Sequence, residues 1–119
     1  MFLIMNYKTF RVLLILYMAL ILGVSTLPGD SLPKTWLLNW DKLIHLFEYF
    51  FLGILAMMSL KNTSITSSLG VILFGILFGS IDEYLQSFIS GRFSSGLDVL
   101  ADGIGVTIGV LLVVGNKSK

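Results

Sequence analysis

The stretch Asp41–Leu60 reads DKLIHLFEYFFLGILAMMSL and combines a long apolar run with a few regularly spaced polar residues. Its length is that of one helical passage through the hydrocarbon core of a bilayer. On a helix, His45 lies one turn after Asp41, and Glu48 and Tyr49 lie one turn further on, so these side chains share one side. Charged groups inside hydrocarbon normally face a cavity or a partner. The stretch therefore predicts a membrane-spanning helix with a polar stripe turned towards other helices.

The composition of the whole chain supports a membrane protein. Of its 119 residues 55% are hydrophobic and 13% are charged, and the mean hydropathy is +0.91. A soluble domain of this size needs a larger polar coat, whereas lipid solvates outward-facing apolar side chains. The net charge of +1, without a basic patch, argues against a nucleic-acid partner. The absence of cysteine excludes disulfides, thiolate metal sites and a cysteine nucleophile.

Three further apolar runs flank the quoted stretch. The first follows Lys8 and Arg11 and has the layout of a signal peptide, but 25–27 is a poor cleavage site, so we expect it to stay as a span. The third run ends at either Ile81 or Ile89. The predicted fold is all-α, a polytopic four-transmembrane-helix bundle in a single domain over 1–119, with a short helix or loop between the third and fourth helices. The expected spans are 12–27, 43–60, 66–89 and 97–114.

Charge asymmetry predicts the orientation of this bundle. Five of the eight Lys and Arg residues fall on the side of the two termini, which favours both termini in the cytoplasm. All seven carboxylates, together with His45, fall in the opposite loops or in the helix halves that adjoin them. We therefore expect the polar groups to gather near the outer face of a cell membrane.

Three of the predicted helices bring acids to the same depth, which predicts an outer-face polar pocket. Carboxylates held close together share a proton, pair with Arg92 or Lys42, or bind a cation. Carboxylates and an imidazole are adequate ligands for Mg²⁺, Mn²⁺ or Zn²⁺, so a divalent cation is a candidate cofactor. The candidate pocket residues are Asp41, His45, Glu48, Tyr49, Asp82, Glu83, Gln86, Arg92, Asp98 and Asp102.

Most members of this set also have a purely structural explanation; Asp82 and Glu83, for example, can form a solvated end of the third helix. Asp41 and Asp98 suit helix N-caps, and a single histidine can be a satisfied hydrogen-bonder between helices. Glu48 can snorkel outward, and Arg92 can serve only to neutralise the acids. The site hypothesis rests on these residues jointly rather than on any one of them.

Glycine spacing predicts tight helix packing. Gly75 and Gly79 are four apart, as are Gly105 and Gly109. Small residues at this spacing let helix backbones approach closely. We expect the third and fourth helices to pack tightly against each other.

Two segments resemble the VanZ-like family. Residues Asp41–Gly53 resemble its "D-K-x-x-H-…-Y-…-L-G" segment, and Asp82–Phe88 followed by Arg92 and Asp98 resemble its "D-E-x-x-Q-…-R-…-D" segment. The resemblance covers roughly residues 10–114 and implies a bacterial multi-span membrane protein, in a family named for a member linked to teicoplanin resistance. It supplies no established reaction. One departure is Asp102, where the family pattern usually has Asn. The motif positions carried over are Asp41, His45, Tyr49, Asp82, Glu83, Gln86, Arg92 and Asp98.

Three functions follow as hypotheses. In the first, the pocket binds a lipid-linked envelope precursor or a glycopeptide and modulates susceptibility to teicoplanin. In the second, it is a metal-assisted enzyme site for a lipid-linked phosphate or acyl substrate, with His45 or Glu83 as general base. A proton or cation path ranks last, because the inner helix halves are almost wholly apolar. The sequence leaves open whether the protein is an enzyme.

Overall fold

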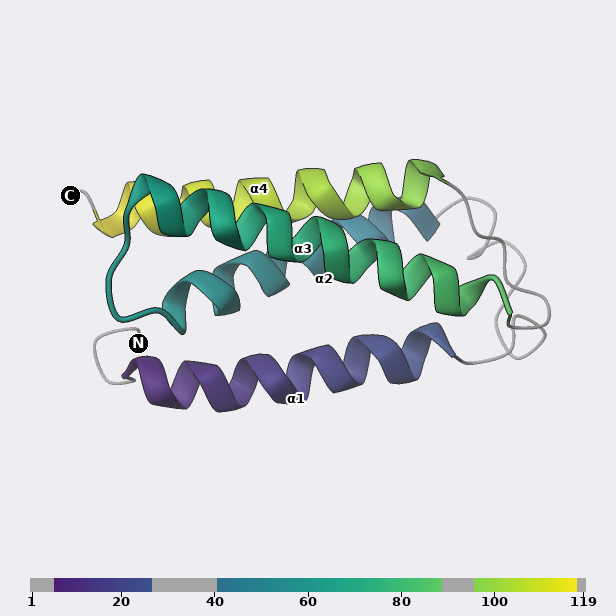
Figure 1. The fold of residues 1–119 in the computed structure, drawn as a ribbon, viewed down its shortest axis with the longest axis horizontal. Coiled ribbons are helices and arrows are strands. Elements are labelled where there is room, and N and C mark those ends of the chain that lie inside the picture. The colour runs from purple at the N-terminus through teal and green to yellow at the C-terminus, as the bar shows by residue number, and fades with distance from the viewer. Residues whose placement is uncertain (1–5, 27–40, 89–95, 118–119) are drawn as a thin grey trace.

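The computed structural model describes residues 6–26, 41–88 and 96–117. This part of the chain forms four helices and no strand. The helices lie side by side along one long axis, and the chain runs back and forth between the two ends of the bundle (Figure 1). The start of the first helix and the end of the last helix lie at the same end of the bundle. The helices are α1 (Tyr7–Ser25), α2 (Asp41–Met58), α3 (Ile65–Gln86) and α4 (Gly96–Lys117).

The starts of α1 and α3 are set by polar capping residues. The Asn6 side chain accepts a hydrogen bond from the Thr9 amide at 3.0 Å. Ser64 and Ser67 form a capping box, in which each side chain accepts from the other residue's backbone N–H, at 3.1 and 2.8 Å. These bonds satisfy amide groups that the first helical turn leaves without a partner. The third helix ends at Gln86, between the two ends that the sequence left open.

Three helices are long and apolar enough to cross a membrane, namely α1, α3 and residues Gly96–Asn116 of α4. A 22-residue helix such as α3 is about 33 Å long, which matches a hydrocarbon core of about 30 Å. Their outward side chains are large and apolar; Ile15, for example, is 66% exposed. The protein is therefore a multi-pass membrane protein in a lipid bilayer. The passage of α2 through the membrane stays a prediction, because α2 carries Asp41, Lys42 and Glu48.

The centre of the molecule is the pair α2 and α4, which run in the same direction and make the most extensive contact of any two helices (Figure 1). A Cβ placed on Gly105 would collide with the backbone carbonyl of Leu46, and one on Gly109 with that of Phe50. Gly53 likewise abuts the Val106 carbonyl, 2.5 Å from its hypothetical Cβ. Glycine is therefore what allows these two backbones to touch.

The helix α3 also packs against α4, through a different pair of glycines. A Cβ on Gly75 would meet the Val106 side chain at 2.5 Å, and one on Gly79 would meet Asp102 Oδ2 at 2.7 Å. The predicted tight packing of the third and fourth helices thus uses Gly75 and Gly79, whereas Gly105 and Gly109 serve the contact with α2.

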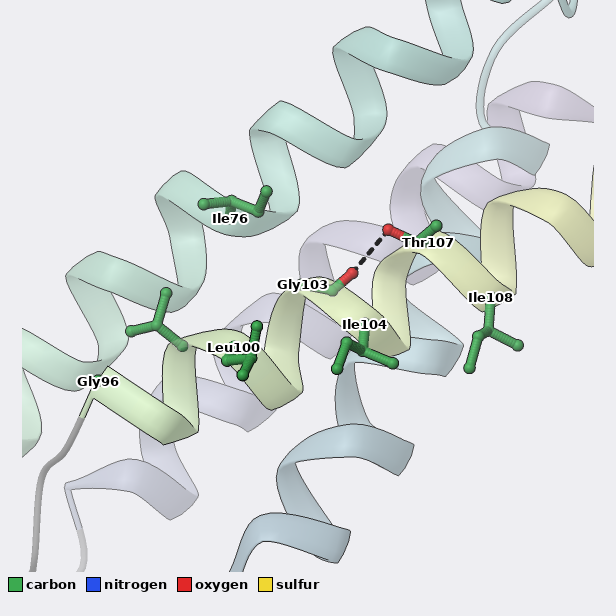
Figure 2. Close-up of a pocket in the computed structure, with 8 residues that line it drawn as sticks. Ile76, Gly96, Leu100, Gly103, Ile104, Thr107 and Ile108 are labelled. Atoms are coloured by element: carbon green, nitrogen blue, oxygen red, sulfur yellow. Dashed lines mark hydrogen bonds between the residues drawn. The ribbon is translucent and has the colours of Figure 1, made fainter.

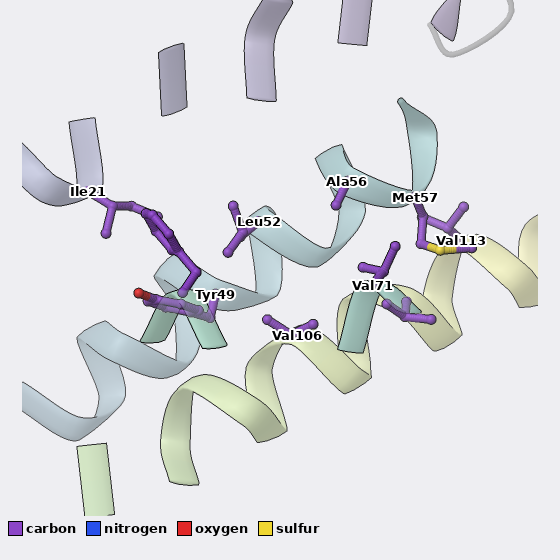
Figure 3. Close-up of a cluster of buried hydrophobic side chains, with 10 residues drawn as sticks. Ile21, Tyr49, Leu52, Ala56, Met57, Val71, Val106 and Val113 are labelled. Atoms are coloured by element: carbon purple, nitrogen blue, oxygen red, sulfur yellow. The ribbon is translucent and has the colours of Figure 1, made fainter. Parts of the chain in front are cut away.

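The apolar core lies between the helices and takes side chains from all four of them (Figure 3). Its buried members are Ile21, Tyr49, Leu52, Ala56, Met57, Val71, Phe78, Val106, Val110 and Val113. The hydroxyl of Tyr17 donates to the Glu48 carbonyl at 2.7 Å, and Arg11 Nε donates to the Ser59 carbonyl at 2.9 Å. These two bonds join α1 to α2 and its following turn.

Candidate functional site

Polar side chains on α2 form a stripe that faces α3 and α4. Lys42, His45 and Tyr49 follow one another at intervals of three and four residues, which places them on one side of the helix. His45 is 3% exposed and Tyr49 is fully buried, while the Lys42 side chain is 50% exposed at the start of the helix. The stripe therefore runs from the start of α2, at one end of the bundle, into the interior of the bundle.

Two aspartates of α4, one turn apart, pair with residues of this stripe. Lys42 Nζ lies 2.6 Å from Asp98 Oδ1, and His45 Nδ1 lies 2.9 Å from Asp102 Oδ1. Because α2 and α4 run in the same direction with their backbones in contact, residues one turn apart on one helix meet residues one turn apart on the other. The two pairs form successive levels of one polar array.

The end of α3 completes the array. Tyr49 donates its hydroxyl hydrogen to Asp82 Oδ2 at 3.1 Å, one level deeper than the His45–Asp102 pair. Asp82, Glu83 and Gln86 are 0%, 8% and 1% exposed, so all three point inward from the last turn of α3. Gly79, one turn earlier, leaves the space that Asp102 occupies.

We refer to these side chains as the polar cluster. Its members are His45, Tyr49, Asp82, Glu83, Gln86, Asp98 and Asp102, with Lys42 at its rim. The cluster is almost fully enclosed, since no member other than Lys42 is more than 8% exposed.

The charge of the polar cluster is strongly unbalanced among the described side chains. Four carboxylates lie within it, and the cations that face them from the described helices are the half-exposed Lys42 and, when protonated, His45. Burying an ionised carboxylate is costly unless hydrogen bonds or an opposite charge compensate.

Some buried polar atoms of the cluster have no hydrogen-bond partner among the described residues. They include Asp98 Oδ2, Asp102 Oδ2 and Gln86 Nε2. In Asp98 and Asp102 the other carboxylate oxygen is engaged, by Lys42 and His45 respectively. Buried polar groups are normally satisfied, so these atoms lack the partners that such groups usually have.

The structure brings together most of the residues that the sequence singled out. Glu48 is half-buried, and its backbone carbonyl faces α1, where it accepts from Tyr17. Arg92 and the side chain of Asp41 lie outside the described residues. Lys42 was not among the candidate pocket residues, but it was expected, with Arg92, as a partner for the acids, and it pairs with Asp98.

A second feature is an apolar groove on the outer surface of α3 and α4 (Figure 2). It has a volume of about 550 Å³ and begins at Gly96, at the membrane face where the polar cluster lies. The Thr107 hydroxyl beside it donates to the Gly103 carbonyl at 2.7 Å, so the groove presents little free polarity. The lining residues are Ile76, Gly96, Val99, Leu100, Gly103, Ile104, Thr107 and Ile108.

Comparison with known proteins places the chain in a family. The model of the VanZ/LLP1 family matches residues 2–115, nearly the whole sequence. No curated protein and no solved structure matches the chain significantly. Its apolar, membrane-length helices agree with the membrane character that the VanZ-like motifs imply. The chain belongs to the VanZ/LLP1 family and is a VanZ-type multi-pass membrane protein.

Proposed function

We propose that the polar cluster binds the polar part of a lipid-linked envelope precursor or of a glycopeptide at the outer face of a bacterial cell membrane. The observation that carries this proposal is the set of buried carboxylate oxygens, Asp98 Oδ2 and Asp102 Oδ2, that lack a partner among the described residues. Such acceptors favour ligands rich in donors, and sugar hydroxyls, peptide amides and ammonium groups supply them. Binding of this kind would modulate susceptibility to teicoplanin.

The apolar groove supports a ligand that carries a hydrocarbon chain. The groove lies on the surface of two helices that are apolar enough to span the membrane, so its surroundings are lipid. It starts at Gly96, two residues before Asp98 of the polar cluster. A lipid chain in the groove would leave its headgroup close to the rim at Lys42.

The proposal includes the topology that this ligand requires. The four helices form one membrane domain in which α2 also spans the bilayer and both termini are cytoplasmic. The ends of α2, α3 and α4 that carry the polar cluster then face the outside, where glycopeptides act.

The proposal is tested by growth in the presence of teicoplanin. The host strain is deleted for the gene and complemented with wild type, Asp98→Asn or, as a matched control, Lys61→Ala in the exposed α2–α3 turn. Wild type and Lys61→Ala should shift the inhibitory concentration equally, and Asp98→Asn should lose the shift at equal abundance in the membrane. Identical inhibitory concentrations for the deletion strain and all three complemented strains would rule out the teicoplanin role.

A metal-assisted enzyme that acts on a lipid-linked phosphate or acyl substrate is a second candidate. The observation that favours it is the His45–Asp102 pair, because a carboxylate bonded to Nδ1 orients an imidazole as a general base or as a metal ligand. Release of phosphate or fatty acid from a lipid substrate by the purified protein, and its loss on chelation, would separate this candidate from simple binding.

A further inference from the structure

Three ligand-type side chains of the polar cluster converge on one point. His45, Glu83 and Asp98 each offer a ligand atom, and these atoms all lie within 4.8 Å of one another. The three residues come from α2, α3 and α4, so the point lies where these helices meet. All three side chains are buried.

From this geometry we infer that His45, Glu83 and Asp98 bind a divalent transition-metal ion, with Zn²⁺ as the best match to the donors. One imidazole nitrogen and two carboxylate oxygens suit Zn²⁺ or Mn²⁺, whereas Mg²⁺ and Ca²⁺ prefer oxygen ligands throughout. Ligand atoms on a tetrahedral Zn²⁺ are about 3.4 Å apart, given bonds of about 2.0–2.2 Å. The trio would close from its present spacing, within 4.8 Å, to that value on binding the ion.

The hydrogen bonds around the trio match a metal site. His45 Nδ1 is bonded to Asp102 Oδ1 at 2.9 Å, so the ring would coordinate through Nε2. A carboxylate on the second nitrogen is the usual support of a metal-binding histidine. In Asp98, Lys42 engages Oδ1 at 2.6 Å and Oδ2 has no partner among the described residues. Asp98 can therefore coordinate through Oδ2 and keep its contact with Lys42.

The charges of the trio are compatible with a cation. Glu83 and Asp98 would place two carboxylates beside a divalent ion while Lys42 stays on the other oxygen of Asp98, so opposite charges would meet inside the apolar bundle. Three protein ligands would leave the fourth position of Zn²⁺ for water or for a ligand oxygen. This inference deepens the proposed function and rests on the polar cluster being a binding site.

The test measures metal occupancy rather than antibiotic response, so it can fail while the teicoplanin experiment succeeds, and the reverse. Tag-free protein in detergent is stripped with a chelator, dialysed and titrated with Zn²⁺ by calorimetry, and the bound metal is counted by mass spectrometry. We expect one ion per chain in the wild type. Co²⁺ in place of Zn²⁺ should give visible absorption bands of a low-symmetry site.

The variants separate ligation from general loss of charge. Glu83→Gln and Asp98→Asn should abolish stoichiometric binding, and an asparagine at 98 can still accept from Lys42. Asp102→Asn should weaken binding by about 10–100-fold, because Asp102 supports His45 without touching the ion. The matched control is Glu48→Gln, which removes an acid of α2 that lies outside the polar cluster, and it should bind as the wild type does. Absence of bound Zn²⁺ in the wild type, or an equal loss in Glu48→Gln, would overturn the inference.

Discussion

At the scale of single residues, Tyr49 and Tyr17 make the same kind of hydrogen bond in different settings. Tyr49 donates to the fully buried carboxylate of Asp82, whereas Tyr17 donates to the Glu48 backbone carbonyl on the side of α1. A bond to a buried charged acceptor contributes about 1.5–3 kcal/mol, and an average side-chain bond between membrane helices about 0.6 kcal/mol. We expect Tyr49→Phe to lower the free energy of unfolding by the larger amount and Tyr17→Phe by the smaller.

Reversible unfolding in mixed detergent micelles measures both changes, and each variant removes one hydroxyl and nothing else. A double-mutant cycle of Tyr49→Phe with Asp82→Asn then isolates the coupling between the two side chains. Equal losses in the two tyrosine variants would show that the buried carboxylate makes the bond no stronger, and a coupling of zero would show that the Tyr49–Asp82 bond adds nothing to stability.

Spacing on one helix made much of the polar cluster predictable from the sequence. The intervals from His45 to Tyr49 and from Asp98 to Asp102 state which residues share a side, since helix geometry fixes that. The pairing of His45 with Asp102 could not be read in the same way. It depends on how far α4 is shifted along α2, which is a property of two helices in contact.

At the scale of helices, the position of α4 along α2 is set where glycines bring the two backbones together. The sequence predicted close packing from Gly105 and Gly109 but assigned it to the third and fourth helices, whereas both glycines face α2. Glycine spacing shows which side of a helix allows close approach, but it does not show which neighbouring helix packs there. The neighbour is decided by the whole arrangement, in which α3 uses its own glycines, Gly75 and Gly79, against α4.

Gly105→Ala is expected to destabilise the contact between α2 and α4. Its methyl group would meet the Leu46 carbonyl and the Phe50 amide nitrogen, and backbone atoms cannot rotate away as a flexible side chain can. Overpacking of this kind costs about 1–3 kcal/mol, and it should also disturb the His45–Asp102 pair. The control is Gly70→Ala in α3, where nothing lies within 4 Å of the added methyl group.

Thermal unfolding of the two glycine variants in the same detergent provides the measurement. Gly70→Ala should unfold at the wild-type temperature or slightly above it, because alanine is the better helix former. An unchanged midpoint for Gly105→Ala would mean that α2 and α4 do not pack backbone to backbone in the membrane protein.

At the scale of the whole molecule, α2 is the helix that decides the topology. Composition alone does not mark it as a span, because Asp41, Lys42 and Glu48 are counted wherever they point. In the folded bundle Lys42 pairs with Asp98 near the start of the helix, and His45 and Tyr49 face α3 and α4. Its outward residues, such as Phe47 and Phe51, are half-exposed apolar side chains suited to lipid. Membrane insertion of α2 is therefore expected to depend on its neighbours, which sequence hydropathy does not include.

The chain contains no cysteine, so single cysteines can report which side of the membrane each connection occupies. We expect an impermeant thiol reagent applied to intact cells to label Lys34→Cys and Ser95→Cys and to leave Lys61→Cys unlabelled until the cells are opened. The reason is that Lys34 precedes α2 and Lys61 follows it, so opposite sides mean that α2 crosses the bilayer.

Labelling of Lys61→Cys alone would reverse the orientation and place the polar cluster at the cytoplasmic face, away from glycopeptides. Identical labelling of Lys34→Cys and Lys61→Cys would mean that α2 does not span, and the four-span bundle would be wrong.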